Sequence, residues 1–264
     1  MIINNFVIDR IKRGMMLSST DGSVLWSINQ ITNPTLTVSS ETVDAVDALG
    51  VPIATFNRAK TAEFSAENSL FDLGLLAAQS GTTVDESTAD NTYNVPVFDD
   101  IKVTAADTAT LSKTPADGTL KYVYIQNGDG TLGEKFTVGS SASGNTVSVS
   151  DKVITFASGK APVGTYIFAM YETEVNGTSG SQASRVINKA SEFPKAGRFL
   201  LEAIGCDVCD QTKVVAAYIE FPVAKLQSDF DYTFATDSTH SFSLKAMQDY
   251  CDPDKLLFKV IIPE

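Results

Sequence analysis

The sequence is poor in the residues that carry most protein chemistry. Its 264 residues include three cysteines, one tryptophan and one histidine. Three cysteines do not make a disulfide framework, so a reducing compartment is the better expectation. Any His-dependent triad or His-ligated metal site has to be built around the single histidine, His240. His240 alternates onto the face of Phe242 and Leu244 at the edge of a turn, which favours a structural or surface role.

Basic charge and long apolar runs are scarce as well. The 20 lysines and arginines are outnumbered by 32 aspartates and glutamates, which gives a formal net charge of -12. This balance excludes a module that binds nucleic acid by neutralising phosphates. No apolar run approaches the roughly 20 residues that span a bilayer, so no membrane span is expected. The first residues lack the basic and then apolar pattern of a signal peptide, so export is not expected either.

One C-x-x-C sequence, Cys206 to Cys209, is present. A zinc ribbon needs a second such pair, and the only other cysteine is Cys251. A thioredoxin-like redox motif needs a strand-to-helix context, whereas this pair lies between two predicted strands. A β-turn with incidental cysteines is favoured, and a metal-binding loop completed by Cys251 stays open.

Carboxylates occur in pairs, but nothing around them indicates catalysis. General acid–base chemistry needs two carboxylates in different environments, whereas exposed alternating acids usually belong to a solvated face. The turn Asn127–Gly130 lacks the distal glutamate of an EF-hand loop. The glycines in and after this turn open no helix that could cradle a phosphate. The sequence therefore predicts no enzyme and no cofactor.

The dominant pattern is a period-two alternation, which is typical of strands with one packed and one wet face. It is clearest at 61–67, 229–234 and 241–246, and further strands are predicted at 24–28, 34–39, 198–205 and 213–226. The predicted wet faces of the three clearest segments carry Glu63, Ser65, Glu67, Asp229, Asp231, Thr233, Ser241 and Ser243. Their apolar partners are predicted to face a core, and the fold class is mainly β.

Only one segment is predicted to form a good helix. Apolar residues recur at helical spacing from Leu70 to Ala77, after Asn68 or Ser69 as a cap. Gly81 is placed to end this helix in the left-handed conformation. Before it, the acidic segment Glu41–Gly50 is either a short helical turn or an excursion out of the sheet.

Changes in composition mark an inserted domain. Residues 1–100 hold 5 basic and 13 acidic residues (-8), residues 101–175 hold 6 and 7 (-1), and residues 176–264 hold 9 and 12 (-3). The near-neutral middle part also has the short strands and frequent turns of a β-sandwich. We therefore predict a discontinuous β domain, 1–100 and 176–264, with an Ig-like β-sandwich inserted at 101–175.

Two stretches resemble the major tail tube proteins of tailed bacteriophages. In one, the extended strand Thr61–Asn68 runs directly into the apolar helix that begins at Leu70. The other runs from Phe221 to Asp231 and resumes at Thr239–Ala246. The resemblance covers about residues 20–80 and 195–264, and the middle unit resembles the Ig-like decorations of some virion proteins.

The resemblance implies a tail-tube-like β-sandwich or barrel with one flanking short helix. Such subunits form homohexameric rings that stack into the hollow tube through which the genome passes. Tail terminator, baseplate and tape-measure proteins would be the other partners, in a virion tail assembled in the host cytoplasm. A wall of acids and hydroxyls repels phosphate, so DNA would pass without specific binding.

The resemblance also gives the polar residues their expected places. The wet-face residues given above are expected to line the lumen. Contacts between stacked rings are expected from an N-terminal arm and from the acidic segment, through Arg10, Lys12, Arg13, Glu41, Asp44 and Asp47.

Two other interpretations of the function remain open at this point. One is a capsid decoration or baseplate protein, which would carry Ig-like content equally well. The other is a carbohydrate-binding or adhesive β-module at 101–175, with an aromatic platform. Its candidate platform residues are Tyr122, Tyr124, Tyr166 and Tyr171. The host, the type of tail and the number of rings stay open.

Overall fold

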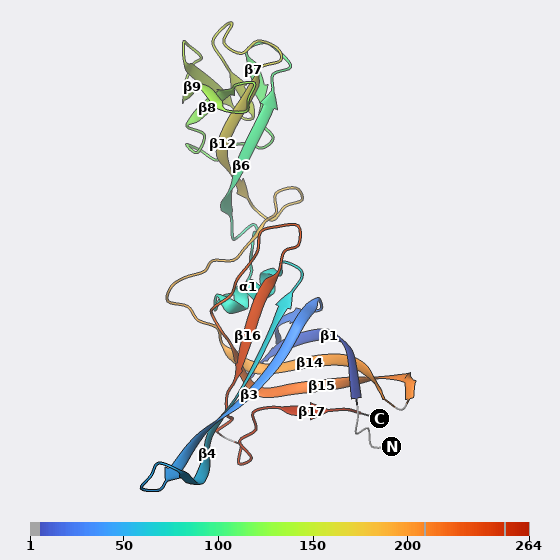
Figure 1. Cartoon of the computed structure of the whole chain (residues 1–264). Helices are drawn as coiled ribbons and strands as arrows, with labels where there is room; N and C mark the ends of the chain where they lie inside the picture. The colour runs from blue at the N-terminus through green and yellow to red at the C-terminus, as the bar shows by residue number, and fades with distance from the viewer. Residues whose placement is uncertain (1–5, 209, 251, 264) are drawn as a thin grey trace. The chain divides into compact units, whose positions relative to one another are not determined.

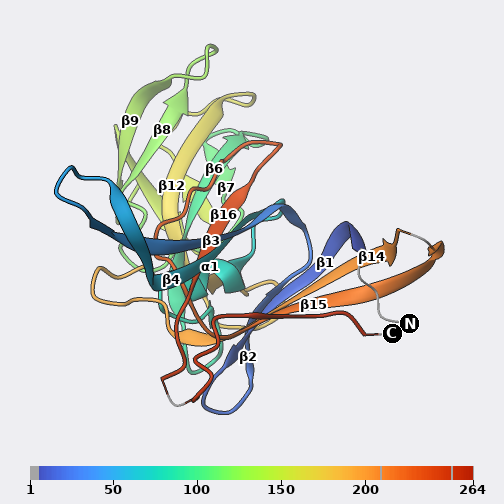
Figure 2. The ribbon, with the colours of Figure 1, turned by 60° about the horizontal axis from the view of Figure 1, so that its bottom comes forward.

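The computed structural model describes residues 6–208, 210–250 and 252–263. The chain is mainly β with one short helix, and it divides into two compact units (Figure 1). Unit 1 comprises Met1–Val84 and Arg185–Glu264, and unit 2 comprises Asp85–Ser184. Figure 2 gives a second view of the same elements.

Unit 1 is built on one large antiparallel sheet. Its elements are β1 (Phe6–Ser18), β2 (Val24–Ile28), β3 (Ile31–Val46), β4 (Pro52–Asn68), α1 (Leu73–Gln79), β14 (Ala196–Asp207), β15 (Asp210–Leu226), β16 (His240–Ala246) and β17 (Lys259–Ile261). Seven of the eight strands follow the order β2-β1-β14-β15-β16-β4-β3, and the eighth, β17, pairs with β15. Alternation along each strand puts one set of side chains into a shared core.

Aromatic rings form the centre of the unit 1 core. The ring of Phe64 lies 5.6 Å from that of Phe199 and 6.1 Å from that of Phe242, measured between centroids. Trp26 packs against the same two phenylalanines, and Leu75 of α1 closes over the cluster. Burial of each large side chain contributes roughly 1.5–3 kcal/mol, so this cluster carries much of the stability of unit 1.

Unit 2 contains a second, nearly closed sheet. Its elements are β5 (Asp85–Glu86), β6 (Tyr93–Lys102), β7 (Thr108–Thr110), β8 (Tyr122–Gln126), β9 (Leu132–Gly139), β10 (Thr146–Ser150), β11 (Val153–Thr155), β12 (Tyr166–Val175) and β13 (Ser184–Arg185, which ends in unit 1). Seven of them follow the order β6-β12-β8-β9-β10-β11-β7, and the small pair β13-β5 stands apart. The end strands β6 and β7 contact each other, so the sheet is barrel-like. The seven strands thus form one sheet rather than the two facing sheets that were expected.

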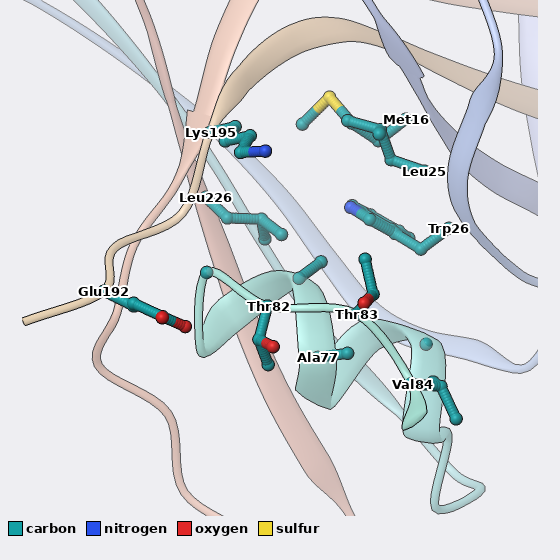
Figure 3. Close-up of a pocket in the computed structure, with 13 residues that line it drawn as sticks. Met16, Leu25, Trp26, Ala77, Thr82, Thr83, Val84, Glu192, Lys195 and Leu226 are labelled. Carbon is teal, nitrogen blue, oxygen red and sulfur yellow. The ribbon is translucent and has the colours of Figure 1, made fainter. Parts of the chain in front are cut away.

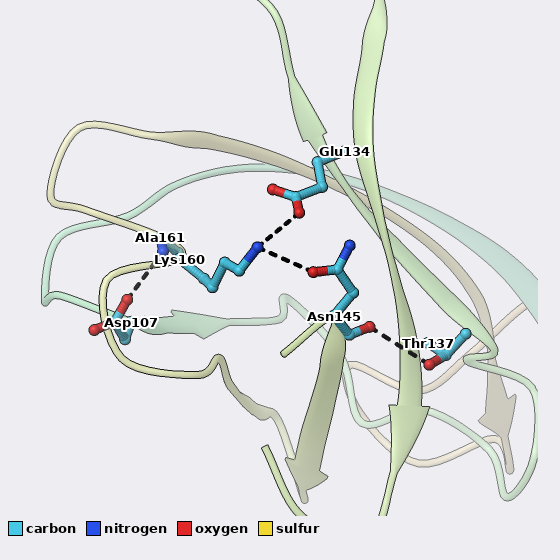
Figure 4. Close-up of polar contacts among 6 residues, drawn as sticks. All are labelled: Asp107, Glu134, Thr137, Asn145, Lys160 and Ala161. Atoms are coloured by element: carbon cyan, nitrogen blue, oxygen red, sulfur yellow. Dashed lines mark hydrogen bonds and ion pairs between the residues drawn. The ribbon is translucent and has the colours of Figure 1, made fainter. Parts of the chain in front are cut away.

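Polar contacts tie the loops of unit 2 to its strands (Figure 4). The Lys160 ammonium lies 2.8 Å from Glu134 Oε1 and donates a 3.0 Å hydrogen bond to Asn145 Oδ1. Next to it, the backbone N–H of Ala161 donates to Asp107 Oδ1 at 2.9 Å. The bond from Lys160 is the main reason why the pKa of Glu134 lies below its ordinary value. The loop before β12 is therefore fixed to β9 and to the loop before β7.

The domain boundaries differ from those expected from composition. Residue 100 falls inside β6, which pairs along its whole length with β12 and so belongs to unit 2. Between 85 and 184 the chain holds 6 basic and 12 acidic residues (-6), so unit 2 is as acidic as unit 1. The apparent neutrality of the middle segment came from placing the boundary inside a strand.

Several local predictions need correction. Helix α1 is capped by Asp72 rather than by Asn68 or Ser69, because Asp72 Oδ1 accepts a 2.7 Å hydrogen bond from the N–H of Leu75. Gly81 follows the helix with φ 73°, as expected. The acidic segment forms no helical turn, because β3 continues to Val46 and turns directly into β4.

Candidate functional site

The predicted wet face exists on neighbouring strands of unit 1. Strand β16 pairs with β4 so that Ser241 lies opposite Glu67 and Ser243 lies opposite Ser65. Glu63 follows on the same side of β4, and the residues that alternate with this set, such as Phe64 and Phe242, are buried. Five of the eight predicted wet-face residues are therefore brought together on one side of two paired strands.

Asp229 and Asp231 reach this face without belonging to a strand. Residues 229–234 form a loop with one isolated bridge, Tyr232 to His240, instead of the predicted strand. The backbone N–H of Asp231 donates to Ser241 Oγ at 2.8 Å, and Ser241 N donates back to the carbonyl of Asp231 at 3.0 Å. Asp229 helps to line a shallow depression of about 250 Å³ together with Ser65, Glu67, Ser241 and Ser243. The loop thus adds two acids to the face.

The remainder of this loop departs from the predicted alternation. Thr233 is exposed, and its N–H donates to the carbonyl of Thr239 at 3.2 Å. Tyr232 packs on Phe71 with ring centroids 4.8 Å apart. Phe234, expected to face the core, is 91 % exposed. With no neighbouring strand to set a pleat beyond the single bridge, sequence alternation does not fix the direction of these side chains.

The same face includes three residues that were not on the predicted list. Thr35 and Thr37 of β3 lie opposite Ser65 and Glu63 of β4, and Lys245 of β16 lies opposite Glu63 from the other side. Lys245 follows Ser241 and Ser243 at the period-two spacing of the segment 241–246, so the sequence pattern alone predicts that it lies on the polar side. The polar face is hereafter this set: Thr35, Thr37, Glu63, Ser65, Glu67, Asp229, Asp231, Ser241, Ser243 and Lys245.

The acidic residues of the segment 41–50 lie in the projecting end of the β3–β4 hairpin. Glu41 is exposed, and Asp44 Oδ1 accepts a 2.7 Å hydrogen bond from Thr55 Oγ1 on the partner strand. Asp47 Oδ1 accepts from the backbone N–H groups of Leu49 and Val51, at 2.8 and 2.9 Å. Asp47 thus shapes the turn, because an aspartate that caps backbone N–H groups fixes a tight turn.

The three basic residues near the N-terminus lie on strand β1 rather than on a free arm. Arg10 forms an exposed ion pair with Asp9 at 3.2 Å. Lys12 and Arg13 both reach Glu202 of β14, at 3.0 and 2.8 Å. These two cations thus have a partner within their own subunit.

His240 is a core residue. Its side chain is fully buried, and its Nε2 lies 2.6 Å from Gln79 Oε1 of α1. Burial lowers the pKa of His240, and the nearby Asp72 opposes this only in part. The described part of the chain contains no group of three or more potential metal ligands. Cys206 lies half-buried in β14, whereas Cys209 and Cys251 lie outside the described residues.

Three of the four tyrosines proposed as a sugar platform share one side of unit 2, and the fourth does not. Tyr171 is fully buried in unit 2, and Tyr122, Tyr124 and Tyr166 lie on the outer side of β8 and β12. The Lys135 ammonium lies 3.7 Å from the ring centroid of Tyr122 and covers it.

A cavity of about 480 Å³ opens beside α1 in unit 1 (Figure 3). Its walls come from β1, β2, α1 with the segment that follows it, the segment before β14 and the end of β15. The residues named in Figure 3 include Met16, Leu25, Trp26, Ala77, Thr83, Lys195 and Leu226. Most of these side chains are apolar. The indole N–H of Trp26, the hydroxyl of Thr83 and the ammonium of Lys195 are hydrogen-bond donors, and the carboxylate of Glu192 also lines the cavity.

No α-helix in the described residues is both long and apolar enough to cross a bilayer. The model of one family, described as the YomU/Tube protein family, matches residues 6–255. The chain belongs to the YomU/Tube protein family. The match spans nearly the whole chain and therefore includes both units. No curated protein matches the chain.

Membership of this tube family confirms the resemblance inferred from the sequence. A tube family implies self-assembly and a place in the tail of the virion. It is a family of structural proteins, which agrees with the lack of a catalytic constellation in the sequence.

Proposed function

We propose that this chain is the repeating subunit of a phage tail tube, forms homohexameric rings, and stacks them into a hollow tube that conducts the genome. The observation that carries the proposal is the family match across residues 6–255, which makes self-assembly the expected behaviour. The one-sided sheet of unit 1 supports it, because a channel wall needs a wet side and a packed side. Tail terminator, baseplate and tape-measure proteins are the further partners of this assembly.

The polar face is the proposed lumen surface. It combines Glu63, Glu67, Asp229 and Asp231 with hydroxyl side chains, and its cation Lys245 lies opposite a second lysine, Lys225 of β15. Fixed negative charge repels phosphates over about a Debye length, ~8 Å at physiological ionic strength. DNA inside such a channel keeps a layer of water between itself and the wall and slides without specific binding.

The two edge strands of the unit 1 sheet support assembly into rings. Within the described residues, β2 and β3 each pair with a strand on one side only. Unpaired edges attract further strands, and closing subunit sheets into a continuous barrel removes them. We propose that the projecting part of the β3–β4 hairpin provides contacts between stacked rings, through the segment that holds Glu41, Asp44 and Asp47. Arg10, Lys12 and Arg13 of β1 are the second proposed contact.

Unit 2 is proposed to be a decoration on the outside of the tube. An open channel for duplex DNA has no room for six copies of a folded unit of this size. The buried core of unit 2 includes Phe136, Ile154 and Ile167, and it shares no side chain with the core of unit 1. A unit with its own core can be carried outside the wall without contributing to it.

Negative-stain electron microscopy of the purified chain after concentration at moderate salt tests the assembly. We expect hollow tubes or six-fold rings. A chain that stays monomeric even when tail initiator is added would contradict the tube function.

A charge reversal tests the lumen. In tubes of the double variant Glu63→Lys/Glu67→Lys, short duplex DNA should be retained and protected from nuclease at low salt. The matched control is Asp90→Lys/Asp117→Lys, which adds the same charge to exposed turns of unit 2. Equal protection in both variants would show that the polar face does not line the channel.

A further inference from the structure

The β3–β4 hairpin extends well beyond the sheet to which it belongs. Strand β16 pairs with β4 only from Glu63 to Asn68, so residues 52–62 of β4 have β3 as their only partner among the described strands. In both views the two strands project away from α1 (Figure 1, Figure 2). An isolated two-stranded ribbon is marginally stable in water, so this part of the chain needs a partner surface.

The projecting ribbon is also unusually apolar for an exposed element. Its exposed large side chains are Val38, Val43, Val46, Leu49, Val51, Ile53 and Phe56. Scattered apolar residues are normal on a surface, but seven along one ribbon indicate a surface that is covered in the assembled state. The ribbon therefore has the character of one half of an interface.

The tip of the ribbon is held in a fixed shape. Leu49 is 88 % exposed at the turn, while its N–H and that of Val51 both donate to Asp47 Oδ1. Neither of these bonds uses the other carboxylate oxygen of Asp47. A preorganised tip loses little conformational entropy on binding, which favours its insertion into a matching cavity. It presents one large apolar side chain next to one negative charge.

The cavity beside α1 has the complementary features. Trp26 is 3 % exposed, and its indole Nε1 is a buried donor without an acceptor. In Figure 3 this nitrogen points into the space bounded by Lys195, Leu226 and Thr83. Met16, a flexible thioether in the same wall, can move aside and give an incoming acceptor access to the indole. The cavity thus presents largely apolar walls, an unused N–H and the Lys195 ammonium, and the one acid in its lining, Glu192, forms an ion pair with Lys189.

We propose that the hairpin tip of a second copy of this chain inserts Leu49 into the cavity beside α1. A backbone carbonyl of the tip accepts the hydrogen bond from Trp26 Nε1, and the carboxylate of Asp47 approaches the ammonium of Lys195. The tip lies far from its own cavity within one subunit, so the contact joins two copies. Tip and cavity are different surfaces, and such head-to-tail contacts repeat without closing, as ring stacking requires.

This inference rests on the proposed tube function. A photo-cross-linking experiment distinguishes a failure of the inferred contact from a failure of the tube function. A photoreactive amino acid at position 49 of assembled tubes should join to neighbouring-copy peptides that contain Trp26, Thr83 or Lys195. The matched control carries the same group at Leu132, an exposed leucine of unit 2 that should give no such product. Tubes in which position 49 cross-links elsewhere overturn the inference and leave the tube function intact. A wild-type chain that forms no tubes or rings even with tail initiator added overturns the function itself.

The single tryptophan gives a second readout. Trp26 emission should shift when wild-type subunits assemble, because a carbonyl then accepts its N–H. Leu49→Ala should raise the concentration needed for assembly about tenfold, which is the effect of one lost apolar side chain. The fold of the unassembled subunit should not change, since Leu49 is exposed there, and circular dichroism of the monomer checks this. Unchanged Trp26 emission on assembly, or unimpaired assembly of Leu49→Ala, overturns the inference.

Discussion

His240 Nε2 lies 2.6 Å from Gln79 Oε1, although the two residues are 161 positions apart in the sequence. Gln79 Nε2 donates to the carbonyl of Ser241 at 3.1 Å, so the orientation of the amide is fixed and its oxygen faces the imidazole. Because an amide oxygen only accepts, His240 must carry its proton on Nε2. Nδ1 of the ring is buried and has no partner. The contact links β16 to the last residue of α1 beneath the polar face.

This geometry predicts a pH dependence of stability with a definite sign. Burial holds the pKa of folded His240 below the ordinary 6.5, so the unfolded chain takes up the proton first as the pH falls. Stability should therefore be complete above about pH 7 and decline below 6.5, by at most about 1.4 kcal/mol per pH unit. Urea unfolding between pH 5 and 7.5 measures this.

The control for that measurement is His240→Gln. Its amide can still donate to Gln79 but does not titrate, so the slope near pH 6 should vanish even if overall stability falls. Since the chain has a single histidine, no other histidine contributes to this slope. An unchanged slope in the variant would contradict the assignment of a buried neutral imidazole.

In unit 2, Tyr171 and Asp99 form a buried polar pair. The hydroxyl of Tyr171 donates to Asp99 Oδ2 at 2.7 Å and accepts from the N–H of Lys113 at 2.9 Å. Burial by itself would raise the pKa of Asp99, but hydrogen bonds from Ser112 and Tyr171 outweigh it and hold that pKa below normal. Tyr171→Phe removes one of the hydrogen bonds to Asp99 and the acceptor of the Lys113 N–H, and should cost unit 2 about 1–3 kcal/mol. Thermal unfolding measures the loss, and Tyr166→Phe on the exposed face should cost almost nothing.

Gly81 is required for two separate reasons. Its φ of 73° disfavours any side chain, and a Cβ there would lie 2.5 Å from the backbone carbonyl carbon of Phe193. Gly81→Ala should therefore lose more than the roughly 1 kcal/mol that positive φ costs, because backbone must move as well. Gly22→Ala is the matched control, with φ 72° and open space around the new methyl group. Equal losses in denaturant unfolding would show that the contact with Phe193 does not matter.

Glu220 fixes the last strand of unit 1 to the sheet. Its carboxylate is reached by Arg198 Nε at 2.8 Å and by Lys259 Nζ of β17 at 3.0 Å. Burial acts to raise the pKa of Glu220, but the bonds and charges of Arg198 and Lys259 lower it below its ordinary 4.5. This contribution is complete above about pH 4.5 and is lost as the pH falls through the lowered pKa of the folded state.

Glu220→Gln removes the charge and keeps the shape of the side chain. We expect a loss of about 1–2 kcal/mol at neutral pH and a weaker pH dependence below 4.5. Hydrogen exchange at Lys259–Ile261 should accelerate, and the exposed Glu41→Gln should leave it unchanged. Protection of β17 that survives Glu220→Gln would mean that backbone pairing alone holds it.

The sequence by itself determined the strands whose two faces differ in polarity. Alternation found β4 and β16 and assigned Glu63, Ser65, Ser241 and Ser243 to one side, because the pleat of a paired strand gives no other choice. It also found the helix and its terminal glycine. The order of these segments carried the family resemblance that the match across residues 6–255 confirms.

Tertiary structure alone decided which strands are neighbours and where each unit ends. Strands β4 and β16 are separated by more than 170 residues, and only the aromatic core brings them side by side. The loop 229–234 alternates like a strand but has one bridge, so its side chains follow hydrogen bonds to β16 instead. The boundary of unit 2 likewise depended on the pairing of β6 with β12, a long-range contact that composition does not encode. Local pattern sets the face of a strand, whereas the choice of its partner is made by packing across the whole core.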